Sequence, residues 1–362
     1  MTYLYAIVVM SIVGGLLSAL LLIANRFLAN YGPCEIKVNE EEPFTIEGGC
    51  TLLEALYEQR IFIPSACGGQ GTCGFCKVQI LDGGGPVLPT ELPFLTRHEI
   101  DEHTRLACQV KVKEPLRVHV REDYLNVQEF KAVVTAARML THDTREIRLR
   151  LVEPEEIDFK PGQYVQVQVP GQSPPVYRAY SVSSPPHEKN DIELVVRLIP
   201  GGLGSTYLHN VQVDDEVTFT GPYGEFILDE GADTEIICVG GGCGMAPMKS
   251  IIHYLYNRSP DRKCTLYFGA RTTADLLYYE EFSELAKDLP NFRVHFALSE
   301  PGEQDADWGG ETGFIHLSVA KHCPDAGPRQ AFLCGPEPMI DATMKVLQDK
   351  ELAEDQVFYD KF

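Results

Sequence analysis

The spacing of four cysteines constrains this chain more than any other feature. The stretch SACGGQGTCGFC at residues 65–76 places Cys67, Cys73 and Cys76 within ten positions among four glycines, and Cys108 follows in RLACQV. A structural zinc ribbon usually has two short C-x2-C pairs, whereas this loop has one. Three cysteines in a glycine-rich loop with a distant fourth are typical of a [2Fe-2S] ferredoxin. The spacing therefore predicts an iron-sulfur cluster with these four ligands; zinc or a chance grouping is the alternative.

The sequence around this loop predicts a small β-grasp domain at residues 33–122. Glycine accepts positive φ and has no Cβ, so the loop can turn tightly and aim backbone N–H groups at sulfur. Thr51 and Glu54 have the spacing of a capping box, which predicts that a short helix begins in TLLEALYEQR. The segments expected to be strands are CEIKV, CKVQIL, LACQVKV and LRVHV.

The first residues predict a transmembrane anchor at residues 1–26. No charged residue occurs from Tyr3 to Asn25, and this run is long enough to cross a bilayer as a helix. A signal peptide is the alternative, but it would have a basic start, a shorter apolar region and a small-residue cleavage site. Arg26 and Lys37 follow the run and no Lys or Arg precedes it. The bulk of the chain is therefore expected on the cytoplasmic side of the inner (plasma) membrane.

Length, charge and cysteine content exclude other classes of protein. With 362 residues the chain is long enough for two or three domains. Its formal net charge of −21 opposes polyanions, so nucleic acid is not an expected partner. Eleven cysteines facing a reducing cytoplasm indicate metal or redox chemistry and argue against a disulfide framework. Cysteines without ligand spacing are expected to pack in cores or to be idle, and none of the ten histidines has metal-ligand spacing.

An antiparallel β-barrel is predicted at residues 128–232, after a polar joint near residues 122–130. Five segments alternate or run apolar over strand lengths: KAVVTAARML, TREIRLRLV, GQYVQVQVP, DIELVVRLI and EVTFTG. In the third, the valines at 165, 167 and 169 are expected on one face and the glutamines at 166 and 168 on the other. The glycine-rich turn 201–206 precedes YLHNV, and the N–H groups of the helix that it opens could bind a diphosphate.

The last part of the chain, residues 233–362, predicts a doubly wound α/β domain that binds a dinucleotide. EIICVGGGCGMAPMKSIIHYLYN indicates a buried strand, a glycine turn and a helix, where pyrophosphate would meet the helix N-terminus. KCTLYFGAR, FRVHFALS and AFLCGPEPM alternate with helical stretches, as in a parallel sheet. No second Arg or Lys follows Arg271 in TTAD, which favours NADH over NADPH. The expected cofactor-binding glycines are Gly240, Gly241, Gly242 and Gly244.

The block SACGGQGTCGFC, followed by GGGPVLPTEL and RLACQV, resembles the ferredoxin domain of the F subunit of the sodium-translocating NADH:quinone reductase. This resemblance covers essentially the whole chain, including the N-terminal run. The motifs RAYS, GPYGEF and CGP are similar to those of the ferredoxin-NADP reductase superfamily. The resemblance implies that the barrel binds FAD rather than FMN.

The superfamily resemblance also implies how the flavin is held. In RAYS, Arg178 would pair with the flavin pyrophosphate, Tyr180 would stack on the isoalloxazine and Ser181 would approach its N5. A planar guanidinium fork suits phosphate, and an aromatic ring suits a flat aromatic cofactor. By itself RAYS could equally be an ordinary strand with one exposed Arg. The implied second contact with the flavin phosphates consists of Gly204, Ser205 and Thr206.

Two further residues take their implied roles from the same resemblance. Cys334 of the CGP motif would lie beside the nicotinamide C4, and the C-terminal Phe362 would cover the flavin. Core packing of the thiol and an ordinary edge-strand aromatic are the alternatives. The implied catalytic residues are Cys334, Tyr180 and Ser181.

The order of the three modules implies an electron path. NADH delivers two electrons as a hydride, a [2Fe-2S] cluster accepts one at a time, and a flavin can divide the pair. We therefore expect a membrane-anchored NADH dehydrogenase subunit. It would pass electrons from NADH through FAD to the cluster and on to other membrane subunits of a sodium-translocating quinone reductase.

One departure from the family keeps alternatives open. Between Tyr164 and Arg178 the chain has a short link, where the family usually carries a long insertion. This link is more similar to soluble oxygenase reductases, so an anchored reductase that supplies an oxygenase or another acceptor is the second hypothesis. A non-catalytic electron carrier with a degenerate reductase body is the third, although RAYS, the glycine turn and CGP are all present.

Overall fold

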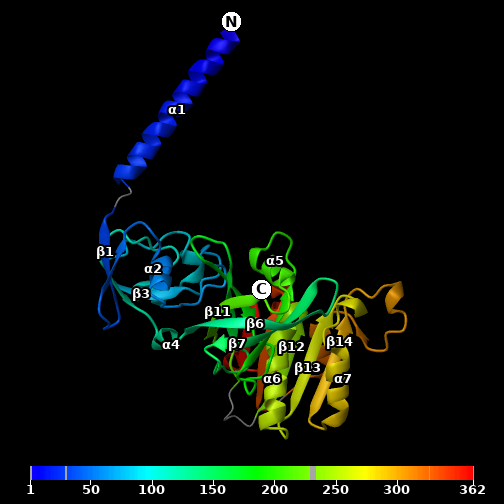
Figure 1. The fold of residues 1–362 in the computed structure, drawn as a ribbon. Helices are drawn as coiled ribbons and strands as arrows, with labels where there is room; N and C mark the ends of the chain where they lie inside the picture. The colour runs from blue at the N-terminus through cyan, green and yellow to red at the C-terminus, as the bar shows by residue number, and fades with distance from the viewer. Residues whose placement is uncertain (1, 29–30, 229–233, 326, 362) are drawn as a thin grey trace. The chain divides into compact units, whose positions relative to one another are not determined.

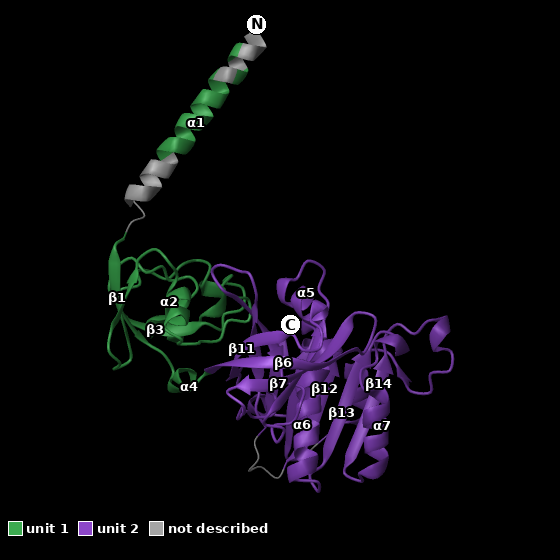
Figure 2. Cartoon of the chain, viewed as in Figure 1, with its two compact units in different colours: residues 1–127 green, residues 128–362 purple. Residues whose placement is uncertain are grey.

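The chain forms two compact units in a computed structural model that describes residues 2–28, 31–228, 234–325 and 327–361 (Figure 1). Unit 1 comprises residues 1–127 and unit 2 comprises residues 128–362 (Figure 2). The division falls at the polar joint that the sequence places between the ferredoxin-like part and the reductase-like part.

Unit 1 begins with helix α1 (Thr2–Leu28). Its side chains at residues 2–4, 6, 8 and 21–28 lie outside the described part of the chain, and the anchor predicted at residues 1–26 falls partly on them. Across the described residues, no helix is both long enough and apolar enough to pass through a membrane.

The rest of unit 1 is a mixed sheet with helix α2 packed on it. The described strands have the order β2-β1-β5-β3-β4, in which β1 and β5 are parallel and the other pairs antiparallel. Leu52 and Leu56 of α2 are fully buried in the same core as Ile36 of β1. The elements are β1 (Pro33–Val38), β2 (Phe44–Glu47), α2 (Leu52–Glu58), β3 (Lys77–Asp82), α3 (Arg97–Asp101), β4 (Thr104–Leu106), β5 (Leu116–His119) and α4 (Glu122–Leu125).

The predicted capping box at the start of α2 is confirmed. The Glu54 amide donates to Thr51 Oγ1 at 3.2 Å, and the Thr51 amide donates to Glu54 Oε2 at 2.7 Å. These two bonds satisfy N–H groups that have no partner within the helix.

The strand predicted at LACQVKV is largely wrong. Strand β4 ends at Leu106, and the amides of Gln109 and Val110 both donate to the Leu106 carbonyl. This turn carries Cys108, which is hydrogen-bonded with Cys76. The apolar alternation in LACQVKV suggests a strand. It arises instead because single residues on either side of the turn are buried.

The first half of unit 2 is an antiparallel sheet with the strand order β10-β7-β6-β11-β8-β9. A bridge between Val182 and Leu194 connects the two ends of this order, as the predicted barrel requires. Gln166 is fully buried, so the strand that carries it is covered on both faces. The elements are β6 (Gln128–Met139), β7 (Thr144–Glu153), β8 (Tyr164–Val169), β9 (Val176–Ser181), β10 (Asp191–Arg197), α5 (Leu203–Asn210) and β11 (Glu216–Tyr223).

The second half of unit 2 is a parallel sheet with helices on both faces, as predicted. Its order is β15-β14-β13-β12-β16-β17. Alternate residues of β12 enter different cores: Cys238 packs with α6, whereas Val239 packs on the opposite side with α8 and α9. The elements are β12 (Glu235–Gly241), α6 (Met245–Arg258), β13 (Cys264–Ala270), α7 (Tyr279–Asp288), β14 (Phe292–Leu298), β15 (Glu311–Thr312), α8 (Ile315–His322), β16 (Arg329–Gly335), α9 (Glu337–Asp349) and β17 (Val357–Lys361).

Candidate functional site

The glycine-rich loop brings the four predicted cluster cysteines together. Gly71 has φ +72° and Gly74 has φ +73°, which is the left-handed region that glycine adopts without strain. A Cβ on Gly71 would lie 2.5 Å from Gln109 Nε2, and that amide nitrogen donates to Cys108 Sγ at 3.6 Å. Glycine at 71 therefore leaves room for a hydrogen bond to one of the sulfurs.

The four thiols associate as two pairs. Cys73 Sγ lies 3.4 Å from Cys67 Sγ, and this hydrogen bond lowers the pKa of Cys67 to about 4 and raises the pKa of Cys73. Hydrogen bonding between Cys76 and Cys108 likewise lowers the pKa of Cys108 to about 7 and raises that of Cys76. Four cysteine sulfurs gathered in two adjacent pairs are the donor set that a two-iron cluster with four cysteine ligands requires.

A buried ion pair, which the sequence reasoning missed, fixes the strand that leads to Cys108. Arg105 Nη2 lies 2.7 Å from Glu91 Oε2, and the two side chains are 4% and 0% exposed. The Leu106 amide donates to Glu91 Oε1 at 2.8 Å, and Arg105 Nη1 donates to the carbonyls of Gly84 and Gly85. The pair thus ties the 83–91 loop to β4, next to the turn that carries Cys108.

Replacing Glu91 by glutamine is expected to destabilise unit 1 by about 3–5 kcal/mol, because it leaves the Arg105 guanidinium buried without a compensating charge. The measurement is thermal loss of the visible circular dichroism of the cluster. Glu40→Gln is the matched control, because the Lys37–Glu40 pair is exposed and contributes at most about 1 kcal/mol. Equal unfolding temperatures for the two variants would contradict the role given to the buried pair.

Within unit 2, the structure brings the RAYS motif against the glycine turn. Arg178, Tyr180 and Ser181 lie on β9, and Gly204 lies at the start of α5. A Cβ on Gly204 would lie 2.6 Å from Tyr180 Oη and 2.8 Å from Arg178 Cγ. Only glycine fits there, so residues far apart in the sequence form one cradle of a cation, a half-buried aromatic ring and a helix N-terminus.

The two hydroxyl residues of the glycine turn differ in position. Ser205 is buried, and its Oγ accepts from the Ile199 amide at 3.1 Å. Thr206 is exposed, and its amide donates to the Gly202 carbonyl at 3.0 Å. The Ser205 hydroxyl therefore shapes the turn, while Thr206 is exposed beside it.

The glycine turn after β12 packs against the segment that carries Cys334. A Cβ on Gly244 would lie 1.9 Å from the Cys334 carbonyl oxygen, and one on Gly240 would lie 3.3 Å from the Gly244 oxygen. Gly241 faces Met339, since a Cβ there would lie 2.7 Å from its sulfur, and Gly242 has φ +55° beside open space. Gly240 and Gly244 thus serve close packing, and Gly241 and Gly242 face a cavity.

That cavity has a volume of about 440 Å³ and lies at the carboxyl edge of the parallel sheet. In a doubly wound sheet, dinucleotides bind at this edge. Its lining combines backbone at the ends of β12 and β13 with two cations, Arg197 and Arg271, and two carboxylates, Asp143 and Asp275. Lining residues include Gly241, Gly242, Arg271, Asp275, Phe314 and Met339.

Two residues that the sequence reasoning passed over lie close to Cys334. Asp360 on β17 is the register partner of Cys334 on β16, and burial raises the pKa of Asp360 to about 6. Cys243, expected to be an idle or core thiol, lines the cavity and is an electrostatic neighbour of both Tyr180 and Cys334. Burial raises the pKa of Cys334 well above its ordinary range. Phe362 lies outside the described residues.

Asp360→Asn is expected to stabilise the protein at alkaline pH. The folded protein holds the Asp360 proton up to about pH 6, whereas the unfolded chain releases it near pH 4, so wild-type stability falls as the pH rises through this window. The neutral amide avoids that loss, with a gain of up to about 3 kcal/mol at pH 8 that shrinks as the pH falls to 5. Chemical unfolding at the two pH values measures it, and a pH-independent difference between variant and wild type would contradict it.

A buried charge network joins the barrel to the parallel sheet within unit 2. Lys249 Nζ of α6 lies 2.6 Å from Glu193 Oε1 of β10, which also accepts from Ser183 Oγ at 2.8 Å. Tyr278 Oη donates to Glu146 Oε2 of β7 at 2.7 Å, and Lys249 Nζ lies 4.2 Å from the Tyr278 ring centroid. These contacts link strands β7 and β10 of the barrel to α6 and Tyr278 of the α/β half.

Three family models match this chain in succession. The 2Fe-2S iron-sulfur cluster binding domain matches residues 36–113, the oxidoreductase FAD-binding domain residues 131–227 and the oxidoreductase NAD-binding domain residues 238–345. The four predicted cluster cysteines, RAYS and Cys334 each lie within the corresponding range.

Curated relatives match the chain from end to end. The F subunit of the Na(+)-translocating NADH-quinone reductase of Neisseria gonorrhoeae is 35% identical, with all of both chains covered. The chain belongs to this family of F subunits. The corresponding protein of Klebsiella pneumoniae is 34% identical with the same coverage. The Neisseria alignment runs over 405 positions against 362 residues here, so that relative carries residues that this family member lacks.

Two of the solved structures similar to this member of the F-type subunits are reductases. The cytochrome P450 reductase GcoB of Amycolatopsis is 30% identical with a TM-score of 0.73, covering 91% of this chain and 98% of that one. A ferredoxin reductase in carbazole 1,9a-dioxygenase is 28% identical with a TM-score of 0.71 and the same coverage. The protein is thus an NADH-dependent oxidoreductase whose cofactors are FAD and a [2Fe-2S] cluster, as predicted.

Proposed function

We propose that this chain is the electron-input subunit of a sodium-translocating, quinone-reducing membrane complex. It oxidises NADH, and electrons pass through FAD and the [2Fe-2S] cluster to partner subunits in the membrane. The observation that carries the proposal is the end-to-end match to the Neisseria relative, with the three cofactor domains in one order. The proposed domains are 33–122 for the cluster, 128–232 for FAD and 233–362 for NADH.

The cluster is assigned to the two sulfur pairs of unit 1. Cys67 and Cys73 would hold one iron, and Cys76 and Cys108 the other. The 3.4 Å separation within the first pair and the hydrogen bonding within the second support this assignment. The Gln109 amide, by donating to Cys108 Sγ, stabilises negative charge on that sulfur.

The flavin is assigned to the cradle of β9 and α5. Bound FAD would accept a hydride from NADH and release the electrons singly to the cluster. Arg178 would pair with its pyrophosphate, Tyr180 would cover the ring system and Ser181 would reach N5. Gly204 lets the helix N-terminus approach the same phosphates, while Ser205 and Thr206 shape and flank that turn. The C-terminal Phe362 is proposed to cover the flavin.

The dinucleotide is assigned to the cavity at the sheet edge. Gly241 and Gly242 would meet the pyrophosphate, with Gly240 and Gly244 allowing the close packing behind them. Cys334 would touch the nicotinamide ring, with Asp360 beside it. Arg271 and Asp275 line the cavity, and a carboxylate there disfavours a 2′-phosphate, which supports NADH over NADPH.

We further propose that residues 1–26 anchor the chain to the inner (plasma) membrane in a single pass, with the bulk cytoplasmic. The uncharged run from Tyr3 to Asn25 and the cations Arg26 and Lys37 that follow it support this location. An anchor would keep the cluster near membrane-bound acceptor subunits.

The function is tested on tagged full-length protein drawn from its native membrane in mild detergent. We expect other membrane subunits to co-purify and NADH:quinone reduction to be stimulated by sodium. If the protein comes out alone and reduces ferricyanide with NADH but does not reduce quinone, the electron path stands and the sodium-pump assignment is wrong.

A second candidate function is an anchored reductase that supplies an oxygenase or another acceptor. It is supported by the short link between Tyr164 and Arg178 and by the similarity to reductases in P450 and dioxygenase systems. The membrane preparation separates the two candidates, because an oxygenase reductase has no sodium-dependent quinone activity. A non-catalytic carrier would not oxidise NADH at all.

A further inference from the structure

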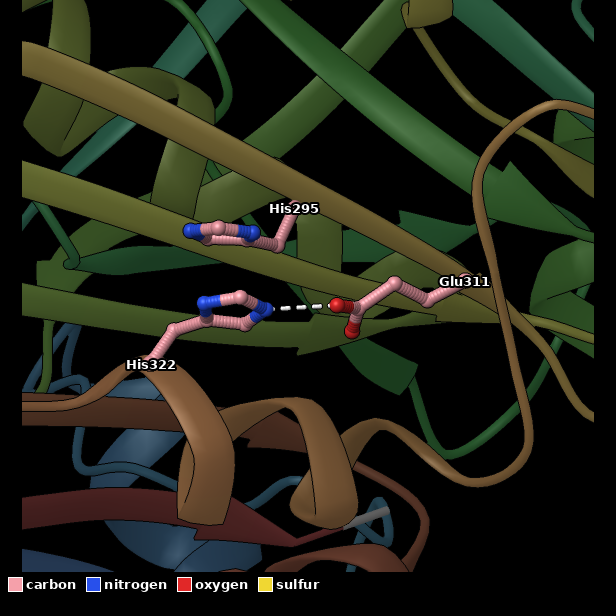
Figure 3. A group of neighbouring side chains, drawn as sticks. All are labelled: His295, Glu311 and His322. Atoms are coloured by element: carbon pink, nitrogen blue, oxygen red, sulfur yellow. Dashed lines mark hydrogen bonds and ion pairs between the residues drawn. The ribbon is translucent and has the colours of Figure 1, made fainter.

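Three side chains that can bind metal converge where α8 packs against the parallel sheet. His295 lies on β14, Glu311 on β15, and His322 is the last residue of α8. Each offers a ligand atom within 4.8 Å of the others, and all three are half buried. Figure 3 shows the two imidazole rings lying one over the other, with the Glu311 carboxylate facing a ring nitrogen of His322.

The cluster has the charge and the lone pairs that a divalent cation requires. Burial first, and then the neighbouring His322, lower the pKa of His295, so its ring is neutral at physiological pH. Burial alone would raise the pKa of Glu311, but interactions with Ser318, Lys321 and His322 outweigh it and bring the pKa to about 2. Two imidazoles and one carboxylate form a ligand set that zinc accepts readily.

We propose that His295, Glu311 and His322 form a binding site for a divalent cation of the zinc class, with water in the fourth position. Bonds of about 2.1 Å at tetrahedral angles place ligand atoms about 3.4 Å apart. The three ligand atoms already lie within 4.8 Å of one another, so a turn of one side chain can assemble the site. His322 also ends a helix, where the free carbonyl groups favour a cation.

The ring that must move is His322. The rings of His295 and His322 lie 4.2 Å apart at 15°, and an imidazole lone pair points along its ring plane, so parallel rings cannot share a cation. Tyr267 stacks on the other face of His295 at 5.1 Å and holds that ring in place. His322 Nε2 lies 2.5 Å from Glu311 Oε1, and a turn of the His322 ring opens this bond to admit the cation.

Lys321 competes for the same carboxylate. Its Nζ lies 2.9 Å from Glu311 Oε1, but the side chain is 67% exposed and can move into water at little cost. The competing interpretation is an ordinary ion pair in which Glu311 and His322 tie β15 to α8 without metal. The two interpretations differ in whether Zn2+ protects both imidazoles from chemical modification.

A cation here would brace the NADH cavity. Gly313, Phe314 and His316 lie in the chain between the ligands Glu311 and His322, and all three line the cavity. This inference is independent of the proposed electron path, because none of the three ligands is assigned to a cofactor.

The test is residue-resolved modification of the intact holoprotein by diethyl pyrocarbonate, with and without micromolar Zn2+ alone. We expect Zn2+ to slow modification of His295 and His322 at least fivefold, while the exposed His119 in unit 1 reacts at an unchanged rate. Zinc taken up by cysteines elsewhere leaves this readout unaffected. Unchanged rates at both histidines, or equal slowing at His119, would overturn the site.

A variant extends the test to the third ligand. Glu311→Gln is expected to abolish protection of both histidines, whereas Glu303→Gln, a nearby exposed control, retains it. Flavin absorbance reports whether the variant has folded. If the variant has not folded, the modification rates of the wild-type protein alone decide whether the site exists. Full protection in a folded Glu311→Gln protein would remove Glu311 from the site.

Discussion

Cys108→Ala is expected to abolish the [2Fe-2S] cluster and leave reduction of the flavin by NADH intact. Cys108 is buried and shares hydrogen bonding with Cys76, so its removal leaves one of the two sulfur pairs incomplete. A cluster that needs four thiolates cannot form with three unless another ligand replaces the missing one. The cradle proposed for the flavin and the cavity proposed for NADH both lie in unit 2, a separate compact unit. The visible spectrum and electron paramagnetic resonance of the dithionite-reduced protein measure the cluster, and anaerobic stopped-flow measures the flavin.

Cys50→Ala is the matched control for this variant. Cys50 lies in the same unit and is half buried, and its sulfur makes a long contact of 3.9 Å with the Glu47 carbonyl. We expect the cluster signal of the Cys50→Ala protein to equal that of the wild-type protein. A Cys108→Ala protein that loses cluster and flavin reduction together, while still folded, would contradict the modular electron path.

The sequence predicts the features of this fold that depend on neighbours along the chain. The capping box at Thr51 and Glu54 is a local motif, and the structure has both of its hydrogen bonds. The loop cysteines Cys67, Cys73 and Cys76 come together because glycines close to them in sequence allow the necessary turns. Alternation of strands and helices after residue 233 likewise predicts the parallel sheet, since each strand–helix repeat is complete within a short stretch.

Features that depend on distant pairs are not visible in the sequence. Glu91 and Arg105 look like two ordinary surface charges until folding buries them together. Lys249 and Glu193 are equally inconspicuous in the sequence, although their 2.6 Å contact joins the barrel to the sheet. No motif specifies such pairs, because their spacing along the chain is set by the topology.

The same reason explains why the histidines show no metal-ligand spacing. His295, Glu311 and His322 come from two strands and one helix, and parallel pairing of β14 with β15 is what brings the first two near each other. The strand predicted at LACQVKV fails for a related reason: the chain turns after Leu106, and the contact of Cys108 with Cys76 is a tertiary feature that local alternation does not encode.

The second large effect is expected for Cys334→Ala, which should slow hydride transfer from NADH to the flavin by about tenfold to a hundredfold. Cys334 is buried at the carboxyl end of β16, with Gly244 packed on its carbonyl and Asp360 beside it. Its neighbour Cys243 lines the cavity that we propose for NADH. Loss of the sulfur leaves the nicotinamide ring free to shift, and a displacement of about 1 Å can reduce a rate a hundredfold.

Anaerobic stopped-flow of flavin bleaching, at saturating NADH, separates this effect from weaker binding. We expect the limiting rate to fall, with the cluster spectrum unchanged because the cluster ligands lie in the other unit. Cys264→Ala is the matched control, since Cys264 is also a buried strand cysteine but lies at the start of β13, away from the carboxyl edge. If hydride transfer slows equally in both variants, packing of the parallel sheet accounts for the result. If it slows in Cys334→Ala but is unchanged in Cys264→Ala, the sulfur of Cys334 lies at the site of hydride transfer.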